Sequence, residues 1–264
     1  MFSSMSVGHG GLYHSQSPEG FFLGAAGLKV YPQLHYLPTA SLMSTQVVVP
    51  RGPIQAKGLL LSSIRDPNPV VFFEPKILYR SSVEHVPLSP YALPLSSAEV
   101  LRPGSDLTIV SWGTPLYTVE TALSLLSSPP PSLATFIPED VRKASVEVID
   151  LRTILPWDRE TIVQSVKKTG RLMIVHEAGK IGGVGSEIAS VITEECFLHL
   201  EAPVKRVTGW EYVIYPSFYR SAIHGGTDCD PAFVYSTPVA LAFEKFYIPD
   251  PVRVMDAIVS TLRF

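Results

Sequence analysis

From residue 106 onward, short apolar runs alternate with amphipathic segments along the chain. The apolar runs predict strands at 107–111, 146–149 and 172–175. The amphipathic segments predict helices that begin at Pro115, after Asp158 and after the glycine run Gly182–Gly185. Because strand and helix alternate three times, we expect an α/β fold with a parallel sheet and helices on both faces.

Capping residues mark the ends of these predicted helices. Thr114, Asp158 and Ser186 are residue types that accept hydrogen bonds from the first helical N–H groups, so we expect each to be an N-cap. Pro115 suits a first helical turn, and Gly170 suits a helix end.

The first 80 residues contain one clear helix–strand pair. Pro53 fits a first helical position, and the predicted apolar face consists of Ile54, Lys57-Gly58, Leu60, Leu61 and Ile64. After a break at Asp66–Pro69, the run Val70–Phe73 predicts a buried strand. Residues 81–105 are polar and rich in proline, which predicts a linker between a unit at 1–80 and a second unit at 106–264.

Composition excludes several classes of protein. Of 264 residues, 46% are hydrophobic and 17% charged, which is typical of a globular chain. A net charge of −3 without a basic stripe argues against nucleic acid, and the apolar run 21–28 is too short to cross a membrane. Cys196 and Cys229 form no disulfide framework, and no Cys/His cluster has the spacing of a zinc site.

The segment from Val7 to Pro18 carries the sharpest candidate for chemistry. It combines glycines with two histidines, and Ser17-Pro18 predicts a helix start just after His14. The positive end of a helix dipole favours a neutral imidazole, which suits acid/base chemistry on a charged substrate. The alternative is that His14 only caps a glycine-rich turn.

Three further segments allow a structural or a functional interpretation. Glu74-Pro75-Lys76 follows a buried strand, where open α/β sheets bind ligands, or it forms an ion pair at the sheet edge. Ser63, Asp66 and Asn68 surround a turn whose carbonyls could hold a hard cation. Gly182–Gly185 invites a dinucleotide-binding interpretation, but Ile188 stands where that motif needs Gly or Ala, which favours a tight strand-to-helix turn.

Many of these segments, in order, resemble the beta subunit of the thiamine-diphosphate-dependent 2-oxoacid dehydrogenases. Tyr13 and the run Glu74–Arg80 favour the branched-chain type over the pyruvate type. The segments that carry the resemblance are 8–19, 48–51, 55–60, 72–80, 148–158, 168–172, 176–178 and 246–250.

The resemblance implies a fold, partners and cofactors. Residues 1–80 would be part of a pyrimidine-binding domain, 81–105 a linker, and 106–264 the transketolase C-terminal domain. Two alpha and two beta subunits would share thiamine diphosphate, with Mg²⁺ supplied by the alpha subunit. The assembly would decarboxylate branched 2-oxoacids of the 3-methyl-2-oxobutanoate type and pass the acyl group to a lipoyl group on the transacylase core. Its location would be the mitochondrial matrix or, in bacteria, the cytosol.

The resemblance also assigns roles to residues. His14 would be the proton donor or orienter in reductive acylation, with Tyr13, Ser15 and Gln16 near the substrate and lipoyl group. Carbonyls of the turn at Ser63, Asp66 and Asn68 would hold K⁺.

Three departures from the family pattern shape the expectation for this chain. The family's segment before the histidine motif, with the glutamate that activates the cofactor, is not found here, so we expect the chain as written to be truncated and inactive alone. Residues 31–46 and 212–236 interrupt the family pattern, and we interpret them as translated intron sequence. The alternatives are an inactive interaction fragment that binds alpha subunit or core, a pyruvate-type beta subunit, and a nucleotide-binding module.

Overall fold

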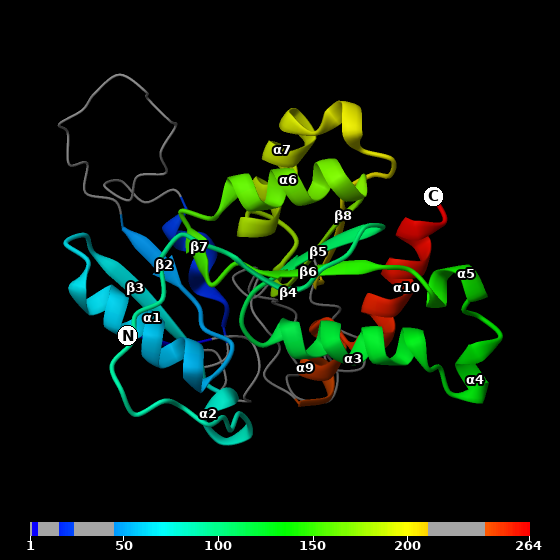
Figure 1. The fold of residues 1–264 in the computed structure, drawn as a ribbon. Coiled ribbons are helices and arrows are strands. Elements are labelled where there is room, and N and C mark those ends of the chain that lie inside the picture. Colours follow the sequence, from blue (N-terminus) through cyan, green and yellow to red (C-terminus); the bar gives the residue numbers. More distant parts are fainter. Residues whose placement is uncertain (1, 5–15, 24–44, 211–240) are drawn as a thin grey trace, which may run out of the picture.

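The computed structural model describes residues 2–4, 16–23, 45–210 and 241–264, which form two sheets flanked by helices (Figure 1). A four-stranded sheet has the order β1-β3-β2-β7, and a five-stranded sheet has the order β4-β6-β5-β8-β9. Strands of both sheets alternate with helices along the chain. The predicted α/β class is therefore confirmed.

The smaller sheet takes strands from both halves of the chain. It consists of β1 (Phe2–Ser4), β3 (Val70–Pro75), β2 (Gln46–Val48) and β7 (Thr153–Leu155). β2 is parallel to β3 and antiparallel to β7. Because β7 lies far along the chain, it ties the smaller sheet to the larger one. Helix α1 (Pro53–Arg65) connects β2 to β3, the short helix α2 (Leu78–Ser81) follows β3, and the 3-10 helix η1 spans Pro18–Phe22.

The larger sheet is parallel except at one edge. Its strands are β4 (Glu99–Arg102), β6 (Val146–Asp150), β5 (Leu107–Ser111), β8 (Leu172–Gly179) and β9 (Lys205–Gly209). β4 pairs antiparallel with β6, and the other pairs are parallel. The three strands predicted in this region are confirmed, β8 being longer than expected.

Helices cover both faces of the larger sheet (Figure 1). On one face lie α6 (Arg159–Thr169) and α7 (Val184–Glu195), and on the other α3 (Pro115–Ser127) and α10 (Pro251–Leu262). Each face has its own apolar core, one around Ile149 and Ile188 and one around Ile109 and Val254. Short helices complete the described part: α4 (Pro131–Ala134), α5 (Glu139–Arg142), η2 (Phe197–His199) and α9 (Leu241–Tyr247).

The predicted apolar face of α1 is confirmed only in part, since Gly58 is buried and Leu60 packs against a small apolar cluster. The helix buries Gln55, Gly58 and Leu59, whereas Ile54 and Ile64 are exposed to 38% and 72%. The buried side holds a glutamine that has hydrogen-bond partners and a glycine against which other side chains pack. A pattern of apolar positions includes Gly58 but does not find Gln55.

The predicted linker 81–105 contains a strand of the larger sheet. Glu99–Arg102 forms the edge strand β4, in which every other residue is exposed. A short edge strand with polar residues has no apolar run to predict it, so the linker is shorter than expected.

Two of the predicted caps are confirmed, Thr114 is confirmed in its N-cap position only, and Ser186 is wrong. The Asp158 carboxylate accepts a hydrogen bond from the Thr161 N–H at 3.1 Å, and Gly170 ends α6 with a φ of +68°. Thr114 already has helical backbone angles, so its side chain makes no capping bond. Ser186 lies inside α7, whose N-cap is Gly183.

Several expectations concern residues outside the described ranges. These include Tyr13, His14 and Ser15, together with residues 31–44 and 212–236 of the two interruptions. Gln46, which belongs to the first interruption, is the first residue of β2 and pairs with Val70. In the described part, no helix is long and apolar enough to span a membrane.

Candidate functional site

The described end of the histidine motif enters the region between the two sheets. Gln16 is half-buried just before η1, and Glu19 within η1 is buried with 3% exposure. The expected helix after Ser17 is present, but it is a five-residue 3-10 turn without a side-chain cap. The dipole of so short a helix is small, so it does not by itself set the protonation of the preceding residues.

Glu19 meets aromatic side chains from the larger sheet and from α9. Burial raises the pKa of its carboxyl to about 7, and the neighbouring indole N–H of Trp112 lowers it in part. Among the described residues, Glu19 Oε1 and Trp112 Nε1 meet no hydrogen-bond geometry. Burial together with the carboxyls of Glu19 and Glu177 raises the pKa of Tyr247 to about 12. Glu19 therefore lies in an apolar environment that favours its protonated form.

The imidazole of His176 lies under the same aromatic ring. It stacks on Trp112 with ring centroids 5.3 Å apart, and both of its nitrogens lack hydrogen-bond partners in the described structure. Burial and the positive charge of Arg206 lower the pKa of His176 to about 3, so the ring is neutral. We call the set Glu19, Trp112, His176, Glu177 and Tyr247 the Glu19 cluster.

The glycine run between β8 and α7 closes over this cluster. Gly182 has a φ of +67°, and a Cβ at Gly185 would lie 2.4 Å from His176 Nε2. Arg206 donates to the Lys180 carbonyl at 2.8 Å and to Ser186 Oγ at 2.7 Å, which fixes both ends of the turn. The geometry agrees with the expected tight strand-to-helix turn, since His176 occupies the space beneath it.

A second polar cluster joins the two sheets on the side of α1. Asp150, at the end of β6, is fully buried and accepts hydrogen bonds from Gln55 Nε2 at 2.9 Å and from the Arg152 N–H at 3.1 Å. Arg51 Nε lies 3.3 Å from the same carboxylate, and Gln55 also donates to Glu99. Burial raises the pKa of Asp150 to about 6, against the lowering effect of these partners. We call Arg51, Gln55, Glu99, Asp150 and Arg152 the Asp150 network.

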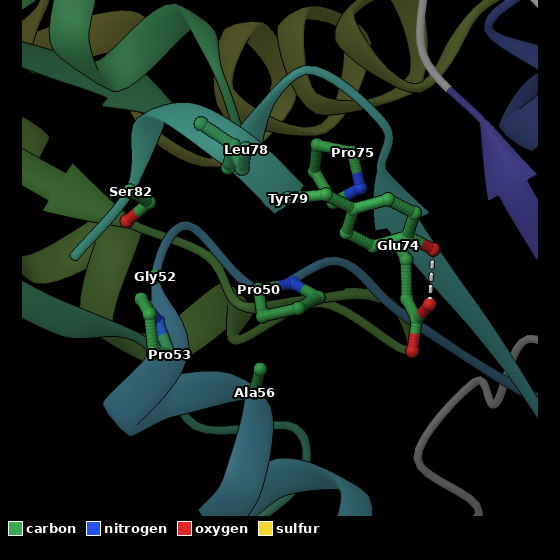
Figure 2. A pocket seen from close by; sticks show the side chains of 9 residues that line it. All are labelled: Pro50, Gly52, Pro53, Ala56, Glu74, Pro75, Leu78, Tyr79 and Ser82. Carbon is green, nitrogen blue, oxygen red and sulfur yellow. Dashed lines mark hydrogen bonds between the residues drawn. The ribbon is translucent and has the colours of Figure 1, made fainter. Parts of the chain in front are cut away.

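A small pocket opens beside the N-terminus of α1 (Figure 2). It measures about 180 Å³, and its walls are largely prolines and aliphatic groups from α1, β3 and α2. The Glu74 carboxylate at its rim accepts a hydrogen bond from the Tyr79 hydroxyl (Figure 2). Glu84 accepts from the Ile54 N–H at 2.7 Å, so a carboxylate of the chain itself already occupies the end of the helix.

The turn at which a cation is predicted lies at the C-terminus of α1, where Asp66 leaves the helix. Asp66 Oδ1 accepts from the Asn68 N–H at 2.8 Å and Asp66 Oδ2 from Gln46 at 3.0 Å, while the Ser63 hydroxyl donates back to the Leu59 carbonyl. Carbonyl oxygens are therefore the donors that the turn would offer a hard cation such as K⁺. No group of three His, Cys, Asp or Glu side chains within the described ranges could hold a metal ion.

Comparisons with known proteins show what this chain is similar to. The family model for the transketolase C-terminal domain matches residues 96–224. The chain is 46% identical over 259 residues to the 2-oxoisovalerate dehydrogenase subunit beta 2 of Arabidopsis thaliana, and that match covers 98% of the chain. It is 44% identical to the corresponding beta subunit of Dictyostelium discoideum over 97% of the chain. Over nearly its whole length the chain is similar to beta subunits of 2-oxoacid dehydrogenases.

The match to this beta-subunit family is partial in length. The chain covers 57% of the Arabidopsis protein and 55% of the Dictyostelium protein, so it spans about half the length of the relatives it matches. A 43% identity to the pyruvate dehydrogenase E1 beta subunit of Acholeplasma laidlawii extends over 66% of the chain and 49% of that protein.

A solved structure supports the fold assignment. It is that of a split-gene transketolase, an inactive beta4 tetramer. It matches with a TM-score of 0.54 and 25% identity, over 84% of this chain and 59% of that chain.

The Glu19 cluster and the Asp150 network were both missed by sequence reasoning. The residues of each cluster are far apart in the chain. In α1, Gln55 is the one polar side chain among the buried residues, and a single glutamine gives no recognisable pattern. One signal was available: His176-Glu177 and Asp150 each stand at or near the carboxyl end of a predicted parallel strand, where such sheets present polar groups.

Proposed function

We propose that this chain is the beta subunit, or a part of one, of a branched-chain 2-oxoacid dehydrogenase. The observation that carries the proposal is the 46% identity to a 2-oxoisovalerate dehydrogenase beta subunit over nearly the whole chain. The reaction would be the oxidative decarboxylation of 3-methyl-2-oxobutanoate and related branched 2-oxoacids, with transfer of the acyl group to a lipoyl group on a transacylase core.

The proposed partner in catalysis is an alpha subunit, in an assembly of two alpha and two beta chains. Thiamine diphosphate would bind between the subunits with Mg²⁺ from the alpha subunit, and it supplies the electron sink for decarboxylation. We assign none of the described side chains of this chain to the cofactor. The mitochondrial relatives support the mitochondrial matrix as the proposed location.

The histidine motif is the proposed contribution of this chain to acyl transfer. His14 would hold or donate a proton near the lipoyl group, with Tyr13, Ser15 and Gln16 lining its approach. Gln16 supports this role by its place at the half-buried entry to η1. We also propose that carbonyls at Ser63, Asp66 and Asn68 hold K⁺, which would stabilise the turn that ends α1.

Reconstitution tests the proposed function. The chain is purified with an alpha subunit of a 2-oxoisovalerate dehydrogenase, supplied with thiamine diphosphate, Mg²⁺ and K⁺, and assayed with 3-methyl-2-oxobutanoate and with pyruvate. Co-purification and turnover that favours the branched substrate support the proposal. Turnover that favours pyruvate identifies the pyruvate type, and failure to bind the alpha subunit contradicts the proposal.

A second candidate is an assembly fragment without activity. The matched split-gene transketolase favours it, because that protein is an inactive beta4 tetramer and so assembles without activity. Stable co-purification with the alpha subunit or with the transacylase core, without turnover of either substrate, would select this candidate.

A further inference from the structure

Helix η1, which ends the histidine motif, packs backbone to backbone on the glycine turn. A Cβ added at Gly20 would lie 3.3 Å from the Gly182 carbonyl oxygen and 3.8 Å from Gly183 Cα. Such a close approach favours a small residue at position 20, whereas a Cβ added at Gly182 would meet nothing within 4 Å. The other side of η1 contacts the smaller sheet, where the ring of Phe22 meets that of Phe73 edge to face at 5.6 Å.

Glu19 holds η1 from the inside of this contact. Its side chain is enclosed, while its neighbour Phe21 is 82% exposed, so η1 has a fixed orientation with Glu19 inward. In the described part of the chain, no lysine or arginine forms an ion pair with Glu19, and Glu19 Oε1 accepts no hydrogen bond. A buried acid without a cationic partner is most stable when neutral.

The glycine turn Gly182–Gly185, on which η1 packs, is fixed by contacts with His176 and Arg206. His176 fills the space under Gly185 and stacks on Trp112, and Arg206 binds the carbonyl of Lys180 and the hydroxyl of Ser186. These contacts belong to the larger sheet and its helix α7. The turn is therefore a rigid surface on which η1 rests.

We propose that Glu19 and the glycine turn Gly182–Gly185 form a seat that positions the histidine motif against the second half of the chain. The inference rests on the proposed function, because only that function assigns His14 a role in acyl transfer. Glu19 follows His14 by five positions, so their Cα atoms can be at most about 18 Å apart. Anchoring Glu19 limits the positions open to His14 before any other contact forms. Glu19 is thus a positioning residue, and the glycine run serves docking.

Hydrogen–deuterium exchange on the chain in complex with the alpha subunit tests the seat directly. Glu19→Ala removes the anchor, Glu19→Gln keeps the shape and hydrogen-bonding atoms of the neutral acid, and Phe21→Ala is the control on the exposed side of the same turn. We expect Glu19→Ala to speed exchange in peptides covering 7–23 by about tenfold or more. Glu19→Gln and Phe21→Ala leave that exchange within about twofold of the unmodified chain.

A second pair of variants guards against a general loss of folding. Gly185→Ala drives a Cβ into His176, whereas a Cβ at Gly183 would meet its nearest atoms at 3.5 and 3.7 Å, an ordinary distance. The seat predicts faster exchange over 7–23 for Gly185→Ala and not for Gly183→Ala. The strands β5 and β6 serve as an internal control for folding. Their exchange should be as slow in every variant as in the unmodified chain.

The results separate the seat from the proposed function. If the unmodified complex turns over 3-methyl-2-oxobutanoate, Glu19→Ala should lower kcat for acyl transfer about 10- to 100-fold with little change in KM, and Glu19→Gln should restore it. If the unmodified complex is inactive, the proposed function fails and the exchange data still decide the seat. Exchange over 7–23 that is unchanged in Glu19→Ala, or equally fast in Glu19→Gln, overturns the inference.

Discussion

The two polar clusters between the sheets differ in how completely their atoms are paired. In the Asp150 network, the buried carboxylate accepts hydrogen bonds from Gln55 and Arg152 and lies beside Arg51. In the Glu19 cluster, Glu19 Oε1, Trp112 Nε1 and both nitrogens of His176 meet no hydrogen-bond geometry in the described structure, although the Trp112 indole lies beside Glu19. Buried polar groups are nearly always paired in stable structure, and exceptions concentrate at functional sites. The comparison indicates that the Asp150 network holds the two sheets together, whereas the Glu19 cluster serves the histidine motif.

The largest loss of stability is expected when the Asp150 network is broken. Asp150→Ala leaves one N–H of the Gln55 amide and the Arg152 N–H buried without an acceptor, and Arg51 without the Asp150 anion. We expect the free energy of unfolding to fall by about 4 kcal/mol, measured by urea denaturation. Glu139→Ala, which removes an exposed pair with Lys143, is the control and should cost less than about 0.5 kcal/mol. A loss below about 1 kcal/mol for Asp150→Ala would show that the network does not join the sheets.

The Glu19 cluster should make the free energy of unfolding depend on pH. Folding raises the pKa of Glu19 from 4.5 to about 7, so the folded state binds this proton more tightly than the unfolded state. The protonated Glu19 therefore contributes its full stabilisation below pH 4.5. As the pH rises to 7 this contribution is lost, and the free energy of unfolding falls by about 3 kcal/mol. The stability of Glu19→Gln should lack this decline.

The contribution of Asp150, whose pKa is raised to about 6, changes in the same direction in both proteins and cancels in the difference. The measurement is urea denaturation of the two proteins between about pH 4 and pH 8. Parallel curves would contradict the buried, neutral Glu19. The groups that face Glu19 and could shift the midpoint are Glu177 and Tyr247, with Arg206 acting on His176.

Two alanine substitutions in the glycine turn test the contact with His176, because only one of them places a methyl group against that ring. Gly185→Ala forces the His176 ring to move against Trp112, and we expect a loss of about 2 kcal/mol in thermal or urea unfolding. Gly183→Ala has room for its methyl group and an extended backbone, so it should stay within about 0.5 kcal/mol of the unmodified chain. Equal losses in the two variants would mean that the turn responds to backbone change in general and not to the contact with His176.

The smallest effect concerns two helix caps, one paired and one not. Asp158→Ala removes hydrogen bonds to Thr161 and Ala98 and should cost about 1 kcal/mol. Thr114→Ala removes a buried hydroxyl that has no partner in the described structure, so it should be close to neutral. A larger loss for Thr114→Ala than for Asp158→Ala would show that pairing in the structure does not predict the free energy of these side chains.

Sequence patterns predicted the regular part of the fold. The runs around Ile109, Val148 and Ile174 became buried parallel strands because continuous apolar runs are buried on both faces of such a sheet. The edge strand β4 and the face of α1 escaped prediction because their burial depends on partners more than 30 residues away. Tertiary pairing of this kind leaves no local signal in the sequence.

The candidate site was predictable only in part. The histidine motif and the turn after α1 were found through resemblance and spacing, and both keep their assigned roles as proposals. Glu19 passed unnoticed, although it lies within the motif, because a single acidic residue after Ser-Pro is typical of a helix start. Its burial follows from the aromatic ring of Trp112 and the glycine turn, which the sequence does not show to be neighbours.

The most direct test of this account is the fluorescence of Trp112 as a function of pH. With Trp157 and Trp210 replaced by phenylalanine, Trp112 becomes the single indole of the chain and reports on the carboxyl beside it. Enclosure of Glu19 between the sheets predicts a change in emission with a midpoint near pH 7, which disappears in Glu19→Gln. A midpoint near the ordinary glutamate value of 4.5, or a transition that persists in Glu19→Gln, would contradict the account.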